Sequence, residues 1–121
     1  MHTPVEVARR ALPKNFPRPC VLLLLREHPA HGYELLERLQ LLGFNRDDPG
    51  RLYRELRLLE NGGLVHSAWE PSETGPDRRI YELTRGGMEA LHVAAQSLAT
   101  TNSIVEVFLS RYSEFVALDP S

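Results

Sequence analysis

Apolar residues in the first half of the chain recur at helical spacing and predict two successive helices. Arg18-Pro19 opens the first, and proline is well tolerated in the first turn of a helix. The run Val21 to Leu25 makes this helix apolar nearly all round, which predicts that it lies at the centre of the core. A second amphipathic helix is expected over residues 30–42, closed by Gly43.

A third helix and a pair of strands are predicted next. Asp47-Asp48-Pro49 supplies an acidic cap followed by proline, a common start of a helix, and Asn61-Gly62-Gly63 supplies its end. Leu64 to Trp69 and Arg79 to Leu83 then alternate as strands do. The tip between them is rich in turn-forming residues, so the two strands are expected to form a hairpin.

The last segment predicts a long helix that Thr84 caps and that continues to about Leu118. Its apolar positions step alternately by three and four residues, the a/d pattern with which a helix packs along a partner helix. The residues on this stripe that we expect to form a dimer interface are Leu91, Leu98, Asn102, Val105, Leu109 and Tyr112. Asn102 occupies an a-like position, where a buried polar side chain can fix the register.

Two other interpretations of this stripe stay open. Part of it could pack on the chain's own first helix. The helix could also break near residues 100–103, since Ser103 and Glu106 have the spacing of a capping box. Dimerisation is compatible with either outcome.

The third helix has two contrasting faces at about 100° per residue. Its apolar face is formed by Leu52, Leu56 and Leu59. The opposite face and its flanks are formed by Gly50, Arg51, Tyr53, Arg54 and Arg57, with Glu55 and Glu60 at the edges. The outward face is therefore cationic with no acid at its centre, as a surface that contacts DNA phosphates or bases requires. Arginines on a solvated face can also serve solubility alone.

The neighbouring hairpin favours the DNA-binding interpretation. Its polar tip includes Thr74, and Arg78-Arg79 stand at the base of the returning strand. A helix followed at once by a basic hairpin is the outline of a winged helix-turn-helix, which lays that helix in the major groove. The predicted DNA-binding residues are Gly50, Arg51, Tyr53, Arg54, Arg57, Thr74, Arg78 and Arg79.

Composition narrows the classes of protein further. The 121 residues, of which 42% are hydrophobic and 25% charged, fit one soluble domain with a helical appendage. The formal charge of −2 means that a basic DNA face must be local. No apolar run is long enough to cross a bilayer and no signal core is present, so we expect a cytoplasmic protein. The single cysteine, Cys20, fits that reducing compartment as a buried hydrophobe.

Signatures of catalysis and metal binding are missing from the sequence. The five histidines and one cysteine show no metal-ligand spacing, and no phosphate-binding glycine loop occurs. No arrangement of nucleophile and base can be proposed either. We therefore expect no enzyme activity, no metal and no cofactor.

The predicted fold class is mainly α with a small β-hairpin: a winged helix-turn-helix plus a long C-terminal dimerisation helix. The expected organisation is an N-terminal arm over residues 1–17, a DNA-binding domain over 18–83 and the dimerisation helix over 84–118. The arm carries prolines and cations, and it could enter the minor groove of DNA or clasp the neighbouring subunit.

Three motifs in order resemble the PadR family of bacterial transcriptional regulators. They are HGYELLERL from His31, LYRELRLLENGGLV from Leu52 and GPDRRIYELTRGG from Gly75. The resemblance covers nearly all of residues 18–87. It implies a dimeric winged-helix repressor that binds a palindromic operator.

The same resemblance suggests roles for individual residues. It places Tyr53 and its neighbours on DNA, assigns Arg78 and Arg79 to the wing, and gives mainly structural roles to His31-Gly32-Tyr33. The motif residues Tyr81 and Thr84 are likewise expected to be structural. The single short last helix departs from relatives that carry a larger helical C-terminal domain, which argues against a large ligand pocket of that type.

The expected function is therefore sequence-specific DNA binding by a homodimeric transcriptional repressor, whose release would require an effector. The alternative is a winged-helix module for protein–protein interaction without specific DNA binding, which the near-neutral charge leaves open. Binding to promoter DNA across a salt series would separate the two.

Overall fold

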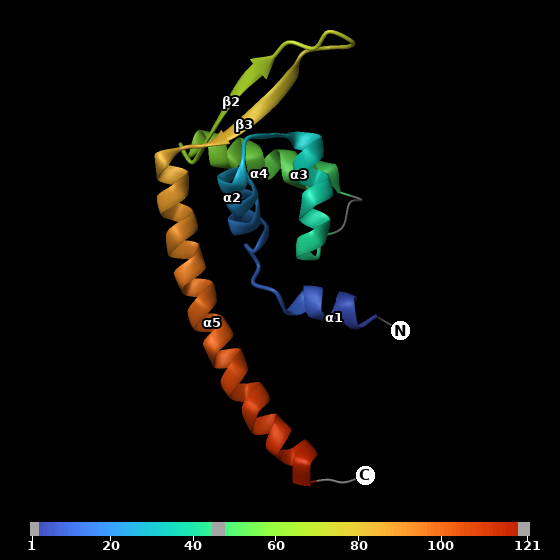
Figure 1. The fold of residues 1–121 in the computed structure, drawn as a ribbon, viewed down its shortest axis with the longest axis vertical. Coiled ribbons are helices and arrows are strands. Elements are labelled where there is room, and N and C mark those ends of the chain that lie inside the picture. The colour runs from blue at the N-terminus through green and yellow to red at the C-terminus, as the bar shows by residue number, and fades with distance from the viewer. Residues whose placement is uncertain (1–2, 45–47, 119–121) are drawn as a thin grey trace. The chain divides into compact units, whose positions relative to one another are not determined.

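A computed structural model describes residues 3–44 and 48–118 (Figure 1). Contacts divide the chain into two compact units, residues 1–91 and 92–121, and each is described by itself. The elements follow in the order α1 (Pro4–Ala11), α2 (Pro17–Glu27), β1 (Ala30–His31), α3 (Gly32–Leu39), η1 (Gln40–Leu42), α4 (Pro49–Asn61), β2 (Val65–Glu70), β3 (Arg78–Leu83) and α5 (Arg85–Leu118). This order confirms the mainly helical winged fold with a long last helix.

The segment over residues 30–42 differs from the single helix expected. Ala30 and His31 form the short strand β1, which pairs antiparallel with β3. Helix α3 begins only at Gly32, and a 3₁₀ turn, η1, follows it before Gly43. The helical pattern could not reveal β1, because a two-residue strand depends on a pairing partner about fifty residues away. Gly43 ends the segment as expected, with a φ of 89°.

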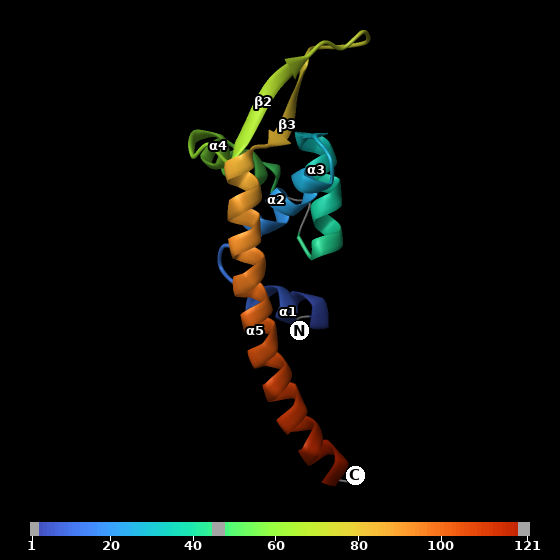
Figure 2. The ribbon, with the colours of Figure 1, turned by 60° about the vertical axis from the view of Figure 1, so that its left-hand side comes forward.

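The sheet is antiparallel, with β3 between β1 and β2. The β2–β3 hairpin is the wing, and its ladder runs from the pair Val65–Leu83 to the pair Glu70–Arg78. Figure 2 shows that the wing extends away from the helices α2, α3 and α4. At its base Val65 and Tyr81 are buried, so this end of the hairpin belongs to the core.

The core is built where α2, α3 and α4 meet. Its largest fully buried side chains are Leu22, Leu35, Leu56, Leu59 and Val21. Four of the five residues from Val21 to Leu25 are buried, which confirms that α2 is central. Burial of such side chains contributes about 1.5–3 kcal/mol each relative to exposure in water.

Local signals end α4 and start α5 as the sequence indicated. Gly63 has a φ of 77°, and the Leu64 N–H donates to the Leu59 carbonyl at 2.9 Å, so α4 stops in a left-handed turn. The Thr84 hydroxyl accepts the Gly87 N–H at 3.0 Å and donates to the Gly63 carbonyl at 2.7 Å. Thr84 therefore caps α5 and ties its first turn to the end of α4.

Helix α5 is continuous over its 34 residues, so the break considered near residues 100–103 does not occur. The hydroxyls of Thr100, Thr101 and Ser103 donate to the carbonyls four residues earlier. A hydroxyl that donates to a carbonyl of the preceding turn is compatible with a position inside a helix.

Two further observations concern the part of the chain that the structure describes. No helix there combines the length and apolarity needed to span a membrane. Nor do three His, Cys, Asp or Glu side chains gather there as ligands of a metal ion.

Candidate nucleic-acid interface

Helix α4 is anchored to the core by its leucine face. Asp48 caps its start by accepting the Arg51 N–H at 3.1 Å, as the sequence indicated, whereas Asp47 lies outside the described residues. Leu52, Leu56 and Leu59 are 5%, 1% and 0% exposed. Since these three side chains fix the helix's rotation, the residues opposite them must point outward.

The five α4 residues singled out for DNA contact are all exposed. They are Gly50, Arg51, Tyr53, Arg54 and Arg57. The structure thus brings them together on one helix face that is open to solvent. That face presents guanidinium groups, which can hold a phosphate or pair with the two acceptors of guanine.

The two glutamates of α4 contact residues of other elements. Glu55 Oε1 lies 2.7 Å from Arg18 Nε, which ties α4 to the start of α2. Glu60 Oε1 accepts a hydrogen bond from the Ser67 hydroxyl at 2.6 Å, which ties α4 to the wing strand β2. Both glutamates of α4 are therefore engaged by residues of other elements.

The wing arginines lie on opposite faces of β3, because successive strand residues point in opposite directions. The Arg79 guanidinium lies 5.0 Å from the centre of the Trp69 ring on the paired strand. Arg78 instead donates to the Tyr33 hydroxyl at 3.1 Å. Thr74 is exposed in the turn between the strands. The two arginines adjacent in sequence therefore have different surroundings, and only Arg79 stacks on the wing itself.

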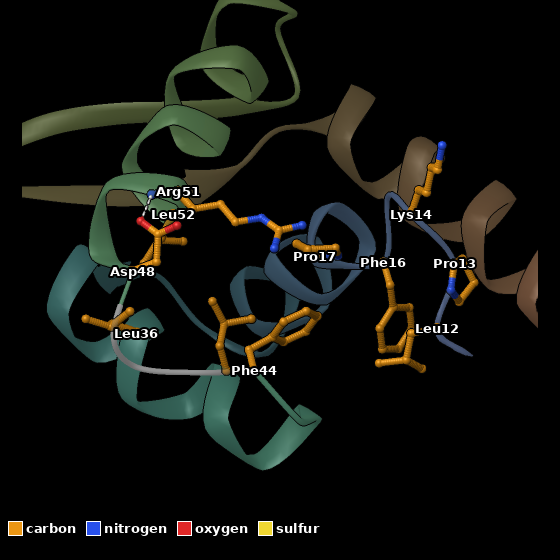
Figure 3. Close-up of a pocket in the computed structure, with 11 residues that line it drawn as sticks. Leu12, Pro13, Lys14, Phe16, Pro17, Leu36, Phe44, Asp48, Arg51 and Leu52 are labelled. Atoms are coloured by element: carbon orange, nitrogen blue, oxygen red, sulfur yellow. Dashed lines mark hydrogen bonds between the residues drawn. The ribbon is translucent and has the colours of Figure 1, made fainter. Parts of the chain in front are cut away.

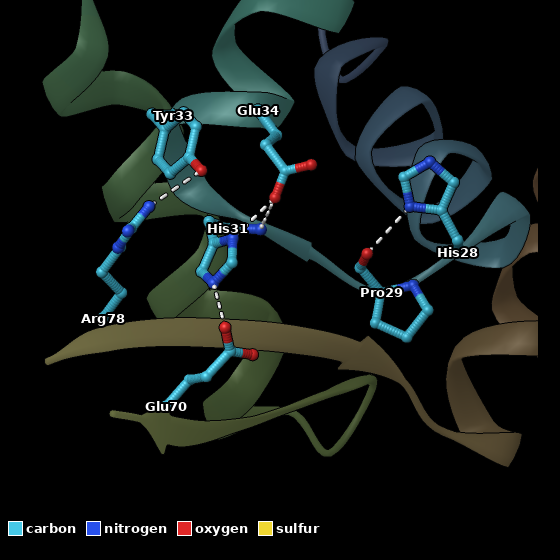
Figure 4. Close-up of polar contacts among 7 residues, drawn as sticks. All are labelled: His28, Pro29, His31, Tyr33, Glu34, Glu70 and Arg78. Carbon is cyan, nitrogen blue, oxygen red and sulfur yellow. Dashed lines mark hydrogen bonds and ion pairs between the residues drawn. The ribbon is translucent and has the colours of Figure 1, made fainter. Parts of the chain in front are cut away.

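Sequence reasoning missed a polar cluster that joins the wing to α3 (Figure 4). Glu34 Oε1 accepts the backbone N–H of His31 at 3.0 Å, and it lies 2.6 Å from Nδ1 of the same residue, within hydrogen-bonding distance. The first of these bonds is the main reason that the pKa of Glu34 is lowered. On the other side of the ring, His31 Nε2 lies 3.4 Å from Glu70 of β2. A residue followed three positions later by Glu has the spacing of a capping box, and that spacing was the available signal.

An apolar pocket of about 380 Å³ lies beside the start of α4. The tilted rings of Phe16 and Phe44, with centroids 5.9 Å apart, form part of its wall. The Arg51 side chain reaches across from α4 toward Pro17 at the start of α2 (Figure 3). Arg51 therefore belongs both to this pocket and to the exposed face of α4.

The six residues expected at a dimer interface differ in their exposure along α5. Leu91, in the first unit, and Leu98, in the second, are half-buried. The remaining four are exposed and belong to the second unit: Asn102, Val105, Leu109 and Tyr112. The Asn102 amide donates to Glu106 at 3.1 Å. Phe108 and Phe115, which the a/d pattern did not include, are also 67% and 70% exposed.

A family model and several solved structures match this chain. The model of the transcriptional regulator PadR-like family matches residues 21–93, more than half of the chain. A PadR-like transcriptional regulator from Bacillus cereus has a similar structure, with a TM-score of 0.68 and 28% identity over 76% of this chain and 89% of the other. A Streptococcus transcriptional regulator is 31% identical, with a TM-score of 0.66, over 75% of this chain and 89% of its own.

A similar structure that contains operator DNA is among the matches. Bacillus subtilis PadR, solved in complex with operator DNA, is 25% identical with a TM-score of 0.61; the match covers 69% of this chain and 48% of that protein. No curated protein matches the chain. The family match covers α2 to the start of α5, which are the elements that build and support the α4 face and the wing. The chain belongs to the PadR-like family of transcriptional regulators.

Proposed function

We propose that the protein is a cytoplasmic homodimeric repressor that binds a palindromic operator in a sequence-specific manner. The observation that carries the proposal is the exposed face of α4, which presents Arg51, Arg54 and Arg57 to solvent. The operator complex of Bacillus subtilis PadR supports DNA as the partner.

The proposed geometry follows from two copies of α4. Each copy would enter a major groove, the two sites being about one helical turn apart on the same side of the duplex. Arg54 and Arg57 would read base edges or hold phosphates, and Tyr53 would contact the duplex beside them. The wing, with Arg79 and Thr74, would hold the neighbouring backbone. Repression would follow from occupation of promoter DNA.

Dimerisation is supported by the surface of the second unit. Its helix exposes a continuous set of large apolar side chains, including Val105, Leu109 and Tyr112. Exposed patches of this kind mark interaction sites, and an a/d spacing selects another helix as the partner. A second copy of the same helix would bury them and would set the distance between the two α4 helices.

Release from the operator would require an effector that favours a different spacing of the two α4 helices. The apolar pocket beside Arg51 has the first turn of α4 in its wall. A small apolar molecule bound there would therefore act directly on the DNA-facing helix.

The test is a fluorescence-anisotropy titration of the full chain with DNA from upstream of its own gene and with shuffled DNA, across a salt series. We expect Arg54→Ala to weaken operator binding by about 1–3 kcal/mol and to relax base preference. Arg79→Ala should weaken binding to both DNAs alike and lower the salt slope by about 1. Arg111→Ala, an exposed arginine of the second unit, is the control and should change neither quantity.

Wild-type affinity in both Arg54→Ala and Arg79→Ala would show that the assigned face is wrong. Equal affinity of the wild type for operator and shuffled DNA would instead favour the protein–protein interaction module.

A further inference from the structure

The distal end of the wing ladder is held by the start of α3. Glu70 and Arg78 are the last register pair of β2 and β3, immediately before the turn. Each reaches a residue of the segment where β1 runs into α3. Arg78 Nη1 donates to the Tyr33 hydroxyl at 3.1 Å, and Glu70 Oε1 lies 3.4 Å from His31 Nε2 (Figure 4). Both strands of the wing therefore contact the start of α3 through their last register pair.

The environment of His31 fixes which of its nitrogens carries hydrogen. Its Nδ1 lies 2.6 Å from Glu34 Oε1, and this carboxyl is kept ionised by the bonds that it accepts from His31. An ionised carboxylate only accepts hydrogen bonds, so Nδ1 must be the donor. The side chain is only 14% exposed and its ring stacks on Tyr33 at 5.5 Å with a 7° tilt, so the ring cannot turn freely.

The other ring nitrogen then has two contrasting states. In neutral His31, Nε2 carries a bare lone pair that faces the Glu70 carboxylate, so two acceptors oppose each other. Among the described residues Nε2 has no hydrogen-bond partner, and Glu70 Oε1 at 3.4 Å is its charged neighbour. In the imidazolium form Nε2 carries hydrogen and a positive charge, and the same contact becomes a charge-assisted attraction.

We propose that His31 is a positioning residue whose protonated ring docks the wing onto α3 through Glu70, so that the wing is held more firmly in mildly acidic solution. For its effect on operator affinity this inference rests on the proposed function. The docking itself concerns the protein without DNA and is independent of the proposed function.

Charged groups from several elements face the His31 ring. Glu34 of α3 and Glu70 of β2 lie on the two sides of its ring. Arg78 of β3 lies over the Tyr33 ring at 5.8 Å, and His28 at the end of α2 acts electrostatically on Glu34. The structure therefore places one carboxylate beside each ring nitrogen of His31.

The direction of the pH effect follows from linkage. If docking requires a proton, proton uptake and docking favour each other, and docking weakens as the pH rises through the range in which an imidazole loses its charge. A comparison of pH 6 with pH 8 brackets the range in which imidazole side chains generally change charge. An ion pair with one partner half in solvent typically changes an equilibrium by about two- to fivefold.

Hydrogen exchange of the wing amides in the full chain tests the docking. After correction for the intrinsic effect of pH, we expect about two- to fivefold more protection at residues 69, 70, 78 and 79 at pH 6 than at pH 8. Glu70→Gln should give high protection at both pH values, because its amide can donate to the bare Nε2. Glu70→Ala should give low protection at both. The two variants remove the same charge, so their difference isolates the hydrogen bond.

A matched control is His66→Gln, which changes an exposed histidine of β2 and should keep the wild-type pH dependence. Imidazole nitrogen chemical shifts supply a spectroscopic check, and they should show the Nδ1–H tautomer of His31 at pH 8. The proposal is overturned by an Nε2–H tautomer, by protection that is independent of pH in the wild type, or by wild-type pH dependence in Glu70→Gln.

Operator titrations of the same proteins separate this inference from the proposed function. At pH 8 Glu70→Gln should bind DNA about two- to fivefold more tightly than Glu70→Ala. If neither the wild type nor any variant binds DNA but the exchange pattern holds, the proposed function fails and the docking stands. If DNA is bound while exchange is the same at both pH values, only the docking fails.

Discussion

The phenol ring of Tyr53 covers Gly32 and so links the exposed face of α4 to the first residue of α3. A Cβ atom on Gly32 would stand 2.6 Å from Tyr53 Cε1 and 2.7 Å from its hydroxyl oxygen, closer than such atoms approach in proteins. Glycine at this position therefore decides where the ring of Tyr53 lies. The same short segment holds the wing through His31 and Tyr33, so it positions both parts of the proposed DNA-binding surface.

Gly32→Ala is expected to displace Tyr53 without unfolding the protein. The colliding atoms belong to the far end of a side chain that can swing outward. The free energy of unfolding in urea should thus change by less than about 1 kcal/mol, while operator affinity falls several-fold. In a Tyr53→Ala background, Gly32→Ala should have no further effect on affinity. A loss of affinity that is as large in that background would show that Tyr53 is not the intermediary.

The leucine face of α4 offers a test of the helix's orientation. Leu56 is 1% exposed, whereas Leu58, two positions later, is 56% exposed. Leu56→Ala should lower the free energy of unfolding by about 2–5 kcal/mol because it leaves a cavity in the core. Leu58→Ala should change it by no more than about 0.5 kcal/mol. Denaturant titrations of the pair check this, and similar losses in both variants would contradict the observed rotation of α4.

The elements with strong local signals could be predicted from the sequence. The cap at Asp48, the left-handed stop at Gly63 and the cap at Thr84 each depend on a residue acting within a few positions of itself. The rotation of α4 was equally accessible, because the spacing of its leucines alone determines which arginines face outward.

Features that depend on distant partners could not be predicted in this way. Strand β1 exists only because β3 passes beside Ala30 and His31. Sequence adjacency suggested one joint role for Arg78 and Arg79, yet the pleat of β3 sends them to Tyr33 and Trp69 respectively. The proposed role of His31 likewise depends on Glu70, a residue 39 positions later in the chain that no periodicity connects to it.

The thiol of Cys20 should be unreactive in the folded protein. Burial raises the pKa of this thiol to about 11, so almost no thiolate exists at pH 8, and the side chain is only 3% exposed. We expect labelling by a disulfide reagent at pH 8 to proceed no faster than unfolding and to become rapid in denaturant. An added exposed cysteine, Ser97→Cys, is the control and should react at once. Rapid labelling of Cys20 in the wild type would contradict its place in the core.

The proposed dimer can be tested with two valines of α5 that differ in register. Val105 lies on the a/d stripe and Val107 two positions away from it, and both are exposed, at 45% and 58%. Val105→Glu should weaken self-association about a hundredfold, equivalent to about 3 kcal/mol, because it forces a charge into an apolar seam. Val107→Glu adds the same charge off the seam and should leave association nearly unchanged. Sedimentation velocity over a range of protein concentrations measures both, with circular dichroism confirming that the helix persists. If the two variants dissociate equally, the contact is broader than an a/d seam; if both remain dimers, α5 is not the interface.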